Sequence, residues 1–261
     1  MFKLFLQDLP IFISERSDGS FRQAQEVRQF LKEKVLVKQQ EFSLLHLELE
    51  NRQKCIVIEK KDLLDEKPWK IFTGDAIVTN LKKEERGVNK TLISMVVGDC
   101  FPIIFFDQKT KNMAMIHAGW QPLYLGILDK TWSKMMKLWQ TQAENLWVFL
   151  GPGIRAESYY LSSKPLQSQD LSWQKYIKQK KKKNNHSKTE LWQVDLPAFI
   201  KDFLFNKSLP VKQLLDSQLD TYSDKRFFSY RRSRESEGLS QKEMLTASRK
   251  RFMLVCELPS N

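Results

Sequence analysis

The sequence predicts a mixed α/β fold, because short apolar runs of strand length alternate along the chain with longer segments of helical periodicity. Three apolar runs at residues 91–97, 102–107 and 113–117 follow one another closely, which is typical of strands in a sheet covered on both faces. A helical stripe at residues 125–140 comes next, before another strand-like run. With 261 residues the chain is long enough to bury a large core.

The first part of the chain predicts one helix and two strands. Residues 21–34 place five apolar side chains on one helical face: Phe21, Ala24, Val27, Phe30 and Leu31. Residues 42–49 and 54–59 predict strands, and the second contains the β-branched run Ile56-Val57-Ile58.

The middle and the end of the chain continue the alternation. Polar residues 108–112 separate two of the three central strands, and the helix predicted at 125–140 has Leu125, Leu128, Trp132, Met135 and Trp139 on one stripe. The buried-type strand 146–150 runs into a sharp turn at Gly151-Pro152-Gly153. The remaining segments predict a helix at 196–205, a loop or short strand at 226–230 and a final strand at 252–258.

The charge is strongly basic, with 43 Lys and Arg against 31 Asp and Glu, a net charge of +12. Seven lysines lie within residues 175–188, a run without acidic residues. We expect this run to be an exposed, mobile loop of about residues 175–188, inserted in a single domain that spans 1–261. The run contains no arginine and lacks aromatic interleaving, so nucleic acid is not the expected partner.

The cysteines and the hydropathy pattern predict a soluble cytoplasmic protein. Cys55, Cys100 and Cys256 are too few and too scattered for a disulfide framework, which favours a reducing compartment. The longest apolar runs are strand-sized, far below the roughly 18 residues of a membrane-spanning helix. Gln7, Asp8 and Pro10 interrupt the N-terminal apolar residues, so no secretory signal is expected.

Cys100 and His117 are the strongest candidates for chemistry. The chain has three histidines, His46, His117 and His186, which excludes a site built from many imidazoles, such as that of a copper oxidase of phenols. Cys100 and His117 each lie at the end of an apolar run, where α/β sheets usually bind ligands. Three interpretations stay open: zinc or copper ligands, a buried cysteine beside a hydrogen-bonded histidine, or a Cys-His nucleophile pair.

Several short motifs, in order along residues 45–258, resemble the laccase-domain, or YfiH-like, family. The segments GDCFPIIFFD (98–107) and MAMIHAGW (113–120) resemble its core signature. Its other characteristic pieces are matched by GDAIVT (74–79), LGPGI (150–154), WQVDL (192–196) and FFSYRR (227–232). The resemblance implies a single-domain, mixed-sheet layered sandwich with flanking helices.

The same resemblance implies a metal site that binds zinc, with copper named in older descriptions. Cys100 and His117 match two of the three family ligands. The third, a histidine in a turn before a strand, has no match here, and Asn51 stands near its place. Asparagine is a poor zinc ligand, and His46 would replace the histidine only with a local shift of the alignment.

Members of the family are described as purine nucleoside phosphorylases that also deaminate adenosine, so the resemblance implies a purine nucleoside and phosphate as substrates. We expect Arg231 and Arg232 to hold phosphate, and Asp99 or Asp75 to carry a proton. One alternative is an amidohydrolase that edits peptidoglycan precursors with Cys100 and His117. The other is a divergent binding protein without catalysis.

Overall fold

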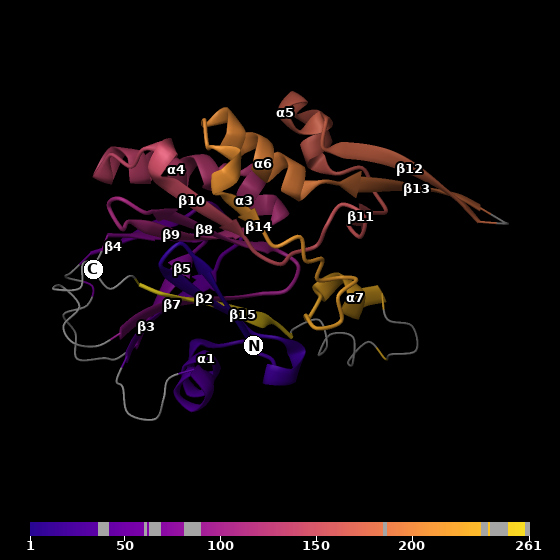
Figure 1. Cartoon of the computed structure of the whole chain (residues 1–261). Coiled ribbons are helices and arrows are strands. Elements are labelled where there is room, and N and C mark those ends of the chain that lie inside the picture. The colour runs from indigo at the N-terminus through magenta and orange to yellow at the C-terminus, as the bar shows by residue number, and fades with distance from the viewer. Residues whose placement is uncertain are drawn as a thin grey trace.

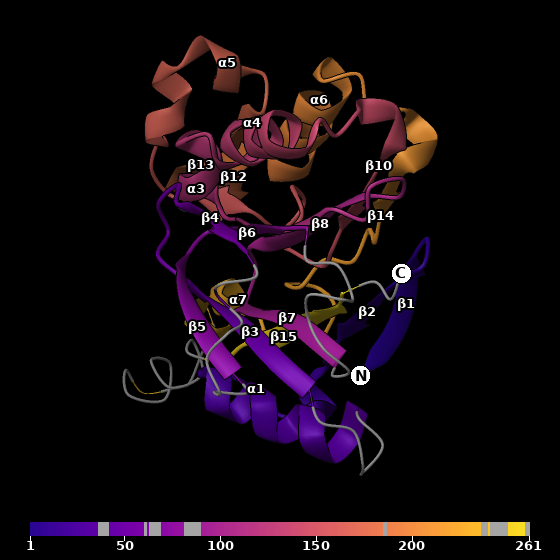
Figure 2. The same ribbon diagram turned by 90° about the vertical axis from the view of Figure 1, so that its left-hand side faces the viewer.

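The computed structural model describes residues 1–35, 42–59, 62, 69–80, 90–184, 187–235, 240 and 250–258. Its main feature is a pair of six-stranded sheets stacked face to face, with helices on both outer faces (Figures 1 and 2). Helix α1 covers one sheet, and helices α3, α4 and α6 cover the other. The predicted mixed α/β fold of layered mixed sheets is confirmed.

The first sheet combines five strands from residues 2–97 with the last strand of the chain. In spatial order it contains β1 (Phe2–Leu6), β2 (Leu9–Ile13), β15 (Phe252–Glu257), β7 (Lys90–Val97), β3 (Phe42–Leu49) and β5 (Trp69–Gly74). Strand β3 pairs in parallel with both of its neighbours, and the other pairs are antiparallel. The parallel pairs bring the C-terminal ends of β3 and β7 to the same edge.

The second sheet contains the three central runs of the sequence. Its spatial order is β14 (Leu214–Asp216), β10 (Leu146–Leu150), β8 (Phe101–Asp107), β9 (Met113–Ala118), β6 (Ala76–Thr79) and β4 (Cys55–Ile58). All residues of β8 and β9 are buried, as the continuous apolar runs predict for strands covered on both faces.

Two helices are longer than the others, α4 (Ile127–Trp139) and α6 (Leu196–Asn206). The shorter helices are α1 (Ala24–Phe30), α3 (Trp120–Tyr124), α5 (Leu171–Gln174) and α7 (Tyr230–Glu235). Single helical turns are η1 (Arg16–Asp18), η2 (Leu31–Val35), η4 (Ala143–Asn145), η5 (Leu166–Gln169) and η6 (Val211–Gln213). Within the described residues, no helix combines the length and the apolar composition that crossing a membrane requires.

The period of two along each strand divides the buried residues between separate cores. Leu254 and Cys256 of β15 face the space between the sheets, whereas Met253 and Val255 pack with α1. In β8, Phe101, Ile103 and Phe105 face the helices, and Ile104 and Phe106 face the other sheet. One slip in register would exchange the two sets, so burial on both faces fixes the register.

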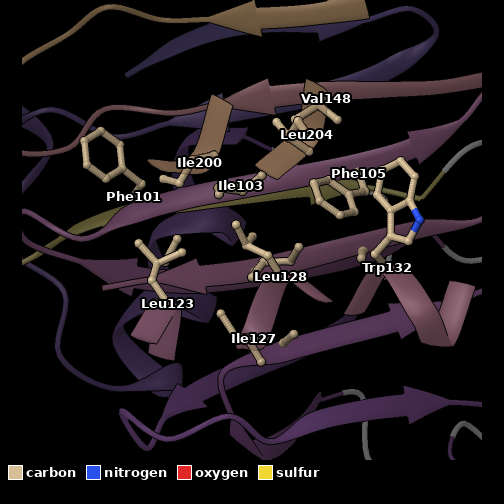
Figure 3. Close-up of a cluster of buried hydrophobic side chains, with 14 of the residues drawn as sticks. Phe101, Ile103, Phe105, Leu123, Ile127, Leu128, Trp132, Val148, Ile200 and Leu204 are labelled. Carbon is tan, nitrogen blue, oxygen red and sulfur yellow. The ribbon is translucent and has the colours of Figure 1, made fainter. Parts of the chain in front are cut away.

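Figure 3 shows the core between the second sheet and its helices. Side chains from β8 and β10 meet side chains from α3, α4 and α6 there. Phe105 and Trp132 lie edge to face, with ring centroids 6.0 Å apart. This packing supports the second sheet next to the edge where β8 begins and β9 ends.

The lysine-rich run corrects one prediction. Residues of the expected loop form β12 (Ile177–Asn184) and β13 (Ser187–Val194), a hairpin that extends away from the body of the molecule (Figure 1). Strand β11 (Tyr160–Leu161) pairs with its base. The hairpin forms because the apolar residues Ile177 and Val194 pair at its base and pack into the helical core. His186 lies outside the described residues.

Most other predicted elements are confirmed, with shifts at their ends. The helix predicted at 125–140 corresponds to α4, which begins at Ile127 because Gly126 has a left-handed backbone (φ 84°) and separates it from α3. The segment 226–230 is a loop that leads into α7. The hairpin β1–β2, in which Pro10 pairs with Phe5, and the strands β5, β6 and β14 were not predicted.

The turn after β10 generates a stability prediction. A Cβ at Gly153 would lie 2.4–2.7 Å from three atoms of the Phe101 ring, which is fully buried. Gly153→Ala should therefore lower the free energy of unfolding by about 1–3 kcal/mol, the usual cost of overpacking a core. Urea unfolding measures the change. Ser163→Ala, at an exposed position, should stay within about 0.5 kcal/mol of the parent, and an equally stable Gly153→Ala protein would contradict the packing.

Candidate functional site

A cavity of about 710 Å³ opens where β3, β7 and β9 end. Its wall includes Asn51 after β3, Cys100 after β7 and His117 at the end of β9. Other parts of the wall come from α7 and from Arg251, which directly precedes β15. Segments from both sheets and from both ends of the chain thus meet at one site, at the strand ends that the sequence predicts.

Cys100 and His117 lie against each other across Gly119. A Cβ at Gly119 would lie 2.9 Å from Cys100 Sγ and 3.3 Å from His117 Nε2. Only glycine leaves room there, which explains the small residue after the histidine. Cys100 is partly exposed and His117 is buried, so the thiol is the more accessible member of the pair.

Asp75 fixes the orientation of His117. Asp75 is completely buried, and its Oδ1 lies 2.9 Å from His117 Nδ1. The backbone N–H groups of Asn51 and Arg52 also donate to its carboxylate, at 2.9 and 2.7 Å. A carboxylate on Nδ1 places the imidazole proton there and turns Nε2 toward Cys100 and the cavity. The predicted proton carrier Asp75 is therefore a positioning residue behind the site.

The charges around His117 favour its protonated form. Burial on its own lowers the pKa of the imidazole, but the charge of Cys100 and hydrogen bonds with Asp75 and Cys100 raise it to about 9. A protonated imidazole next to a cysteine stabilises the thiolate. His117 can therefore act as a proton donor beside Cys100.

Asp99 holds Cys100 in place through an unusual backbone. Its φ is +106°, in the region that favours glycine, at the residue directly before Cys100. The side chain accepts hydrogen bonds from the Thr221 hydroxyl and from the Arg231 backbone N–H, each at 2.7 Å. Burial raises the pKa of Asp99, against these hydrogen bonds. Both oxygens are in use, so Asp99 braces the turn that carries Cys100.

The two predicted phosphate-binding arginines have different surroundings. Arg231 lines the cavity, and its guanidinium lies 5.5 Å from the centre of the Tyr159 ring. Arg232 is not part of the cavity wall. It donates to the carbonyl groups of Thr221, Tyr222 and Phe227, and so holds the loop before α7 together. The prediction that Arg232 holds phosphate does not agree with this geometry, because its guanidinium binds backbone oxygens.

The predicted metal ligands converge only in part. Asn51, Cys100 and His117 all line the cavity, and Asn51 has a left-handed backbone (φ 57°). Within the part of the chain that the structure describes, no group of three or more His, Cys, Asp or Glu side chains is placed to hold a metal ion. Zinc in catalytic sites takes three protein ligands, and an asparagine amide is a poor one. The described residues therefore do not fit a catalytic zinc ion.

His46 also lines the cavity, but its side chain forms a hydrogen bond within the first sheet. It is buried, and its Nδ1 lies 2.8 Å from Ser94 Oγ on the neighbouring strand β7. Burial lowers the pKa of His46 to about 4, so the imidazole is neutral at pH 7.

Five arginine and aromatic residues of the cavity wall were not predicted from the sequence: Arg22, Trp120, Tyr159, Tyr230 and Arg251. Trp120 and Tyr230 were inside motifs quoted for the family, and their exposure, 42% and 46%, marks them as surface aromatic residues. Arg22 and Arg251 lie far from any motif, and only the pairing of β15 with β7 brings Arg251 to Gly98.

Comparison with known proteins identifies a family. The family model described as multi-copper polyphenol oxidoreductase laccase matches residues 16–243. A purine nucleoside phosphorylase of Clostridium acetobutylicum is 28% identical over 96 residues, which cover 37% of this chain and 38% of that protein. One of Rickettsia prowazekii is 27% identical over 160 residues, 60% of this chain and 62% of that protein. The matched segments thus span less than two thirds of these relatives.

A solved structure supports the fold over the whole chain. The crystal structure of a Neisseria meningitidis protein has a TM-score of 0.67 to this chain at 17% sequence identity, and the match covers 100% of this chain and 99% of that one. At this identity the likeness concerns the arrangement of the backbone alone.

The low pKa of His46 generates a pH prediction. The folded imidazole has a pKa of about 4 and the unfolded one about 6.5, so between these values the unfolded chain binds the proton first. The stability due to neutral His46 is complete above pH 7 and falls as the pH drops through this window, by about 2 kcal/mol between pH 7 and pH 5.

Urea unfolding of the parent and of His46→Asn at both pH values tests this. The asparagine amide can keep a hydrogen bond to Ser94 but does not titrate, so the variant should lose about 2 kcal/mol less than the parent on acidification. Identical losses in the two proteins would show that His46 does not cause the acid sensitivity.

Proposed function

The chain belongs to the family described as multi-copper polyphenol oxidoreductase laccase, and we propose that it is a purine nucleoside phosphorylase whose active site is the cavity around Cys100 and His117. Relatives of that name match it at 27–28% identity. We propose that the whole chain acts as one domain, because the cavity wall runs from Arg22 to Arg251. A cytoplasmic location belongs to the proposal, since Cys55, Cys100 and Cys256 are free thiols.

The observation that carries the proposal is the meeting of the Cys100–His117–Asp75 chain with Arg231 and exposed aromatic rings in one cavity. The cavity volume, about 710 Å³, is in the usual range for small-molecule sites. Trp120 and Tyr230 offer ring faces to a purine, and Arg231 offers planar donors to a phosphate. A purine nucleoside with phosphate needs this combination of apolar faces and cations.

Phosphorolysis places clear demands on such a site. A phosphate oxygen forms a bond to C1′ of the ribose while the bond from C1′ to the purine nitrogen breaks, and the electron pair leaves with the base. The leaving base needs a proton, and His117 can donate one from Nε2 because Asp75 holds Nδ1. The Cys100 thiolate would offset positive charge on the ribose as the bond breaks.

No step of this mechanism uses a metal ion, because the described donors do not fit a catalytic zinc. Copper oxidation of phenols, which the family description names, needs several histidines for each site, and His46 is occupied with Ser94. The deamination that the family resemblance implies stays a prediction outside this proposal.

A second candidate function is favoured by one observation. The spatial arrangement is that of a cysteine hydrolase: a nucleophile, Cys100, lies next to a base, His117, which is oriented by the carboxylate of Asp75. The alternative is therefore an amidohydrolase, for example one that edits peptidoglycan precursors, with Cys100 attacking the amide carbonyl. It differs from a phosphorylase in forming an acyl-enzyme on Cys100 and in not needing phosphate.

Cys100→Ala and His117→Ala test the proposal. Each should lower turnover of inosine, adenosine or methylthioadenosine by at least about 100-fold, the usual contribution of an acid-base group. Release of the free base, followed by liquid chromatography, should require inorganic phosphate in the parent protein. Cys55→Ala is the matched control, because Cys55 lies in the helical core and outside the cavity wall.

The outcomes separate the candidate functions. Base release without phosphate, or a covalent adduct on Cys100 with an amide substrate, would favour the hydrolase. Full activity in both variants would refute the site. A folded parent protein that turns over none of these substrates would favour the non-catalytic binding protein.

A second test concerns the metal. Elemental mass spectrometry should find zinc well below one ion per chain in the parent, because among the described residues no three His, Cys, Asp or Glu side chains are placed to hold a metal ion. Asn51→His should raise the zinc content toward one, since Asn51 lines the same cavity and histidine tolerates its left-handed backbone (φ 57°). Adding Cys100→Ala to this variant should remove the gain. One zinc ion per chain in the parent, lost in Cys100→Ala, would contradict the conclusion that the cavity lacks a third zinc ligand.

A further inference from the structure

We propose that the hairpin β12–β13, together with the exposed leucines of the neighbouring turn η5 and helix α5, forms a docking surface for an anionic lipid membrane. The hairpin extends away from the body of the molecule on the helical side of the second sheet, and α5 packs against β12 (Figure 1). Among the described residues, none between 162 and 195 belongs to the wall of the Cys100–His117 cavity. The inference therefore stands apart from the proposed function.

The hairpin carries a dense positive charge. Its two strands contain six lysines against one acidic residue, Glu190. Each strand has eight residues, so the ribbon is about 25 Å long. This length exceeds the roughly 8–10 Å over which salt screens exposed charges. The carboxylates of the body therefore do little to neutralise the lysines of the far half.

The pairing register distributes the lysines over both faces of the ribbon. Because side chains alternate along a strand, Lys178, Lys180 and Lys182 belong to one face, where their partners across the ribbon are uncharged. Lys183 and Lys188 occupy directly opposite positions, and like charges in that relation destabilise a strand pair. A layer of anions bound to the ribbon removes this repulsion.

The lysines at the base of the hairpin are not neutralised within the described part of the chain. Lys178 and Lys180 are exposed, and no described residue forms a hydrogen bond or an ion pair with either of them. Lys175, just before the hairpin, differs because its Nζ lies 2.6 Å from a carboxylate oxygen of Asp202. The charge of the hairpin itself is therefore available to an outside partner.

The elements beside the hairpin expose leucine to the solvent. Leu166 of η5 is 67% exposed and Leu171 of α5 is 83% exposed. The polar residues Gln167 and Ser168 of the same turn η5 are buried, which reverses the usual arrangement of a surface that faces water. Trp173 of α5 is buried and stacks on an aromatic ring of α6, so it holds this element in place. The two leucines are thus presented to an apolar phase by a fixed part of the fold.

The combination of lysine charge and exposed leucine fits a lipid surface better than a nucleic acid. Anionic headgroups attract lysines without a fixed hydrogen-bond geometry, and leucines gain free energy by entering the acyl boundary. Nucleic-acid sites use the forked donors of arginine and free aromatic rings for stacking. Residues 156–225 contain no arginine, and Lys164 already lies over the Trp192 ring, 5.5 Å from its centre. Charge and apolar insertion together are the two signals that stable peripheral binding requires.

Sedimentation of the full chain with lipid vesicles tests the inference. The parent should bind vesicles of phosphatidylglycerol and phosphatidylcholine but not vesicles of phosphatidylcholine alone, and added salt should weaken the binding. The double variant Lys178→Gln, Lys180→Gln should bind about tenfold or more weakly, because each lysine near an anionic surface contributes roughly fivefold. Leu171→Ser should weaken the binding by about fivefold or more. The matched control is Lys109→Gln with Lys225→Gln, which removes the same charge at exposed positions outside the hairpin.

Three other outcomes overturn the inference. The first is equal binding to neutral and anionic vesicles, or binding that the lysine and leucine variants leave unchanged. The second is binding of polyuridylate by a parent protein that binds no vesicles, which would assign the hairpin to a nucleic acid. The third is loss of solubility in the lysine variant when the parent binds no vesicles. It would show that the lysines only protect the open edge of β12 from pairing with other chains.

Discussion

The buried carboxylate of Asp75 is the interaction on which the site depends. It lies in the turn between β5, the edge strand of the first sheet, and β6, which is next to the edge strand β4 of the second sheet, and so connects the two sheets. Its oxygens accept from the turn after β3 and from His117 on β9. A carboxylate without exposure is stable only when such donors surround it. One side chain therefore holds the turn after β3 and also determines which imidazole nitrogen of His117 carries the proton.

Asp99 is the second buried carboxylate that supports the Cys100–His117 pair. Asp75 positions His117, and Asp99 positions Cys100 by linking the turn after β7 to Thr221 and to α7. Both aspartates support the Cys100–His117 pair, and both oxygens of each carboxylate form hydrogen bonds within the protein. The strained φ of Asp99 persists because Ile154 also donates to its carbonyl oxygen, at 2.8 Å. Reactive groups held by buried carboxylates on two rigid sheets lose little entropy when a substrate binds.

The sequence predicted the elements whose pattern is local, and missed those that depend on distant partners. The continuous apolar runs of β7, β8 and β9 and the stripe of α4 are visible in any short window. The hairpin β12–β13 was missed because the lysines of β12 hide the strand pattern, and its apolar residues lie mostly in β13. Cys100 and His117 were predicted from their places at the ends of apolar runs, and Asp75 and Asp99 lie in the motifs around them. Arg22 and Arg251 were not predicted, because the pairing of β15 with β7 and the packing of α1 create their proximity.

The charges of the cavity decide which ligands suit it. Cys100 and His117 share the cavity wall with three arginines, Arg22, Arg231 and Arg251. The arginines then outnumber the carboxylates of the wall, one of which, Asp99, has its pKa raised by burial. The exposed rings of Trp120 and Tyr230 add faces without charge. A ligand that carries both a flat apolar ring and an anionic group would match the aromatic faces and the cationic residues of this wall, whereas an uncharged phenol would match only the aromatic faces.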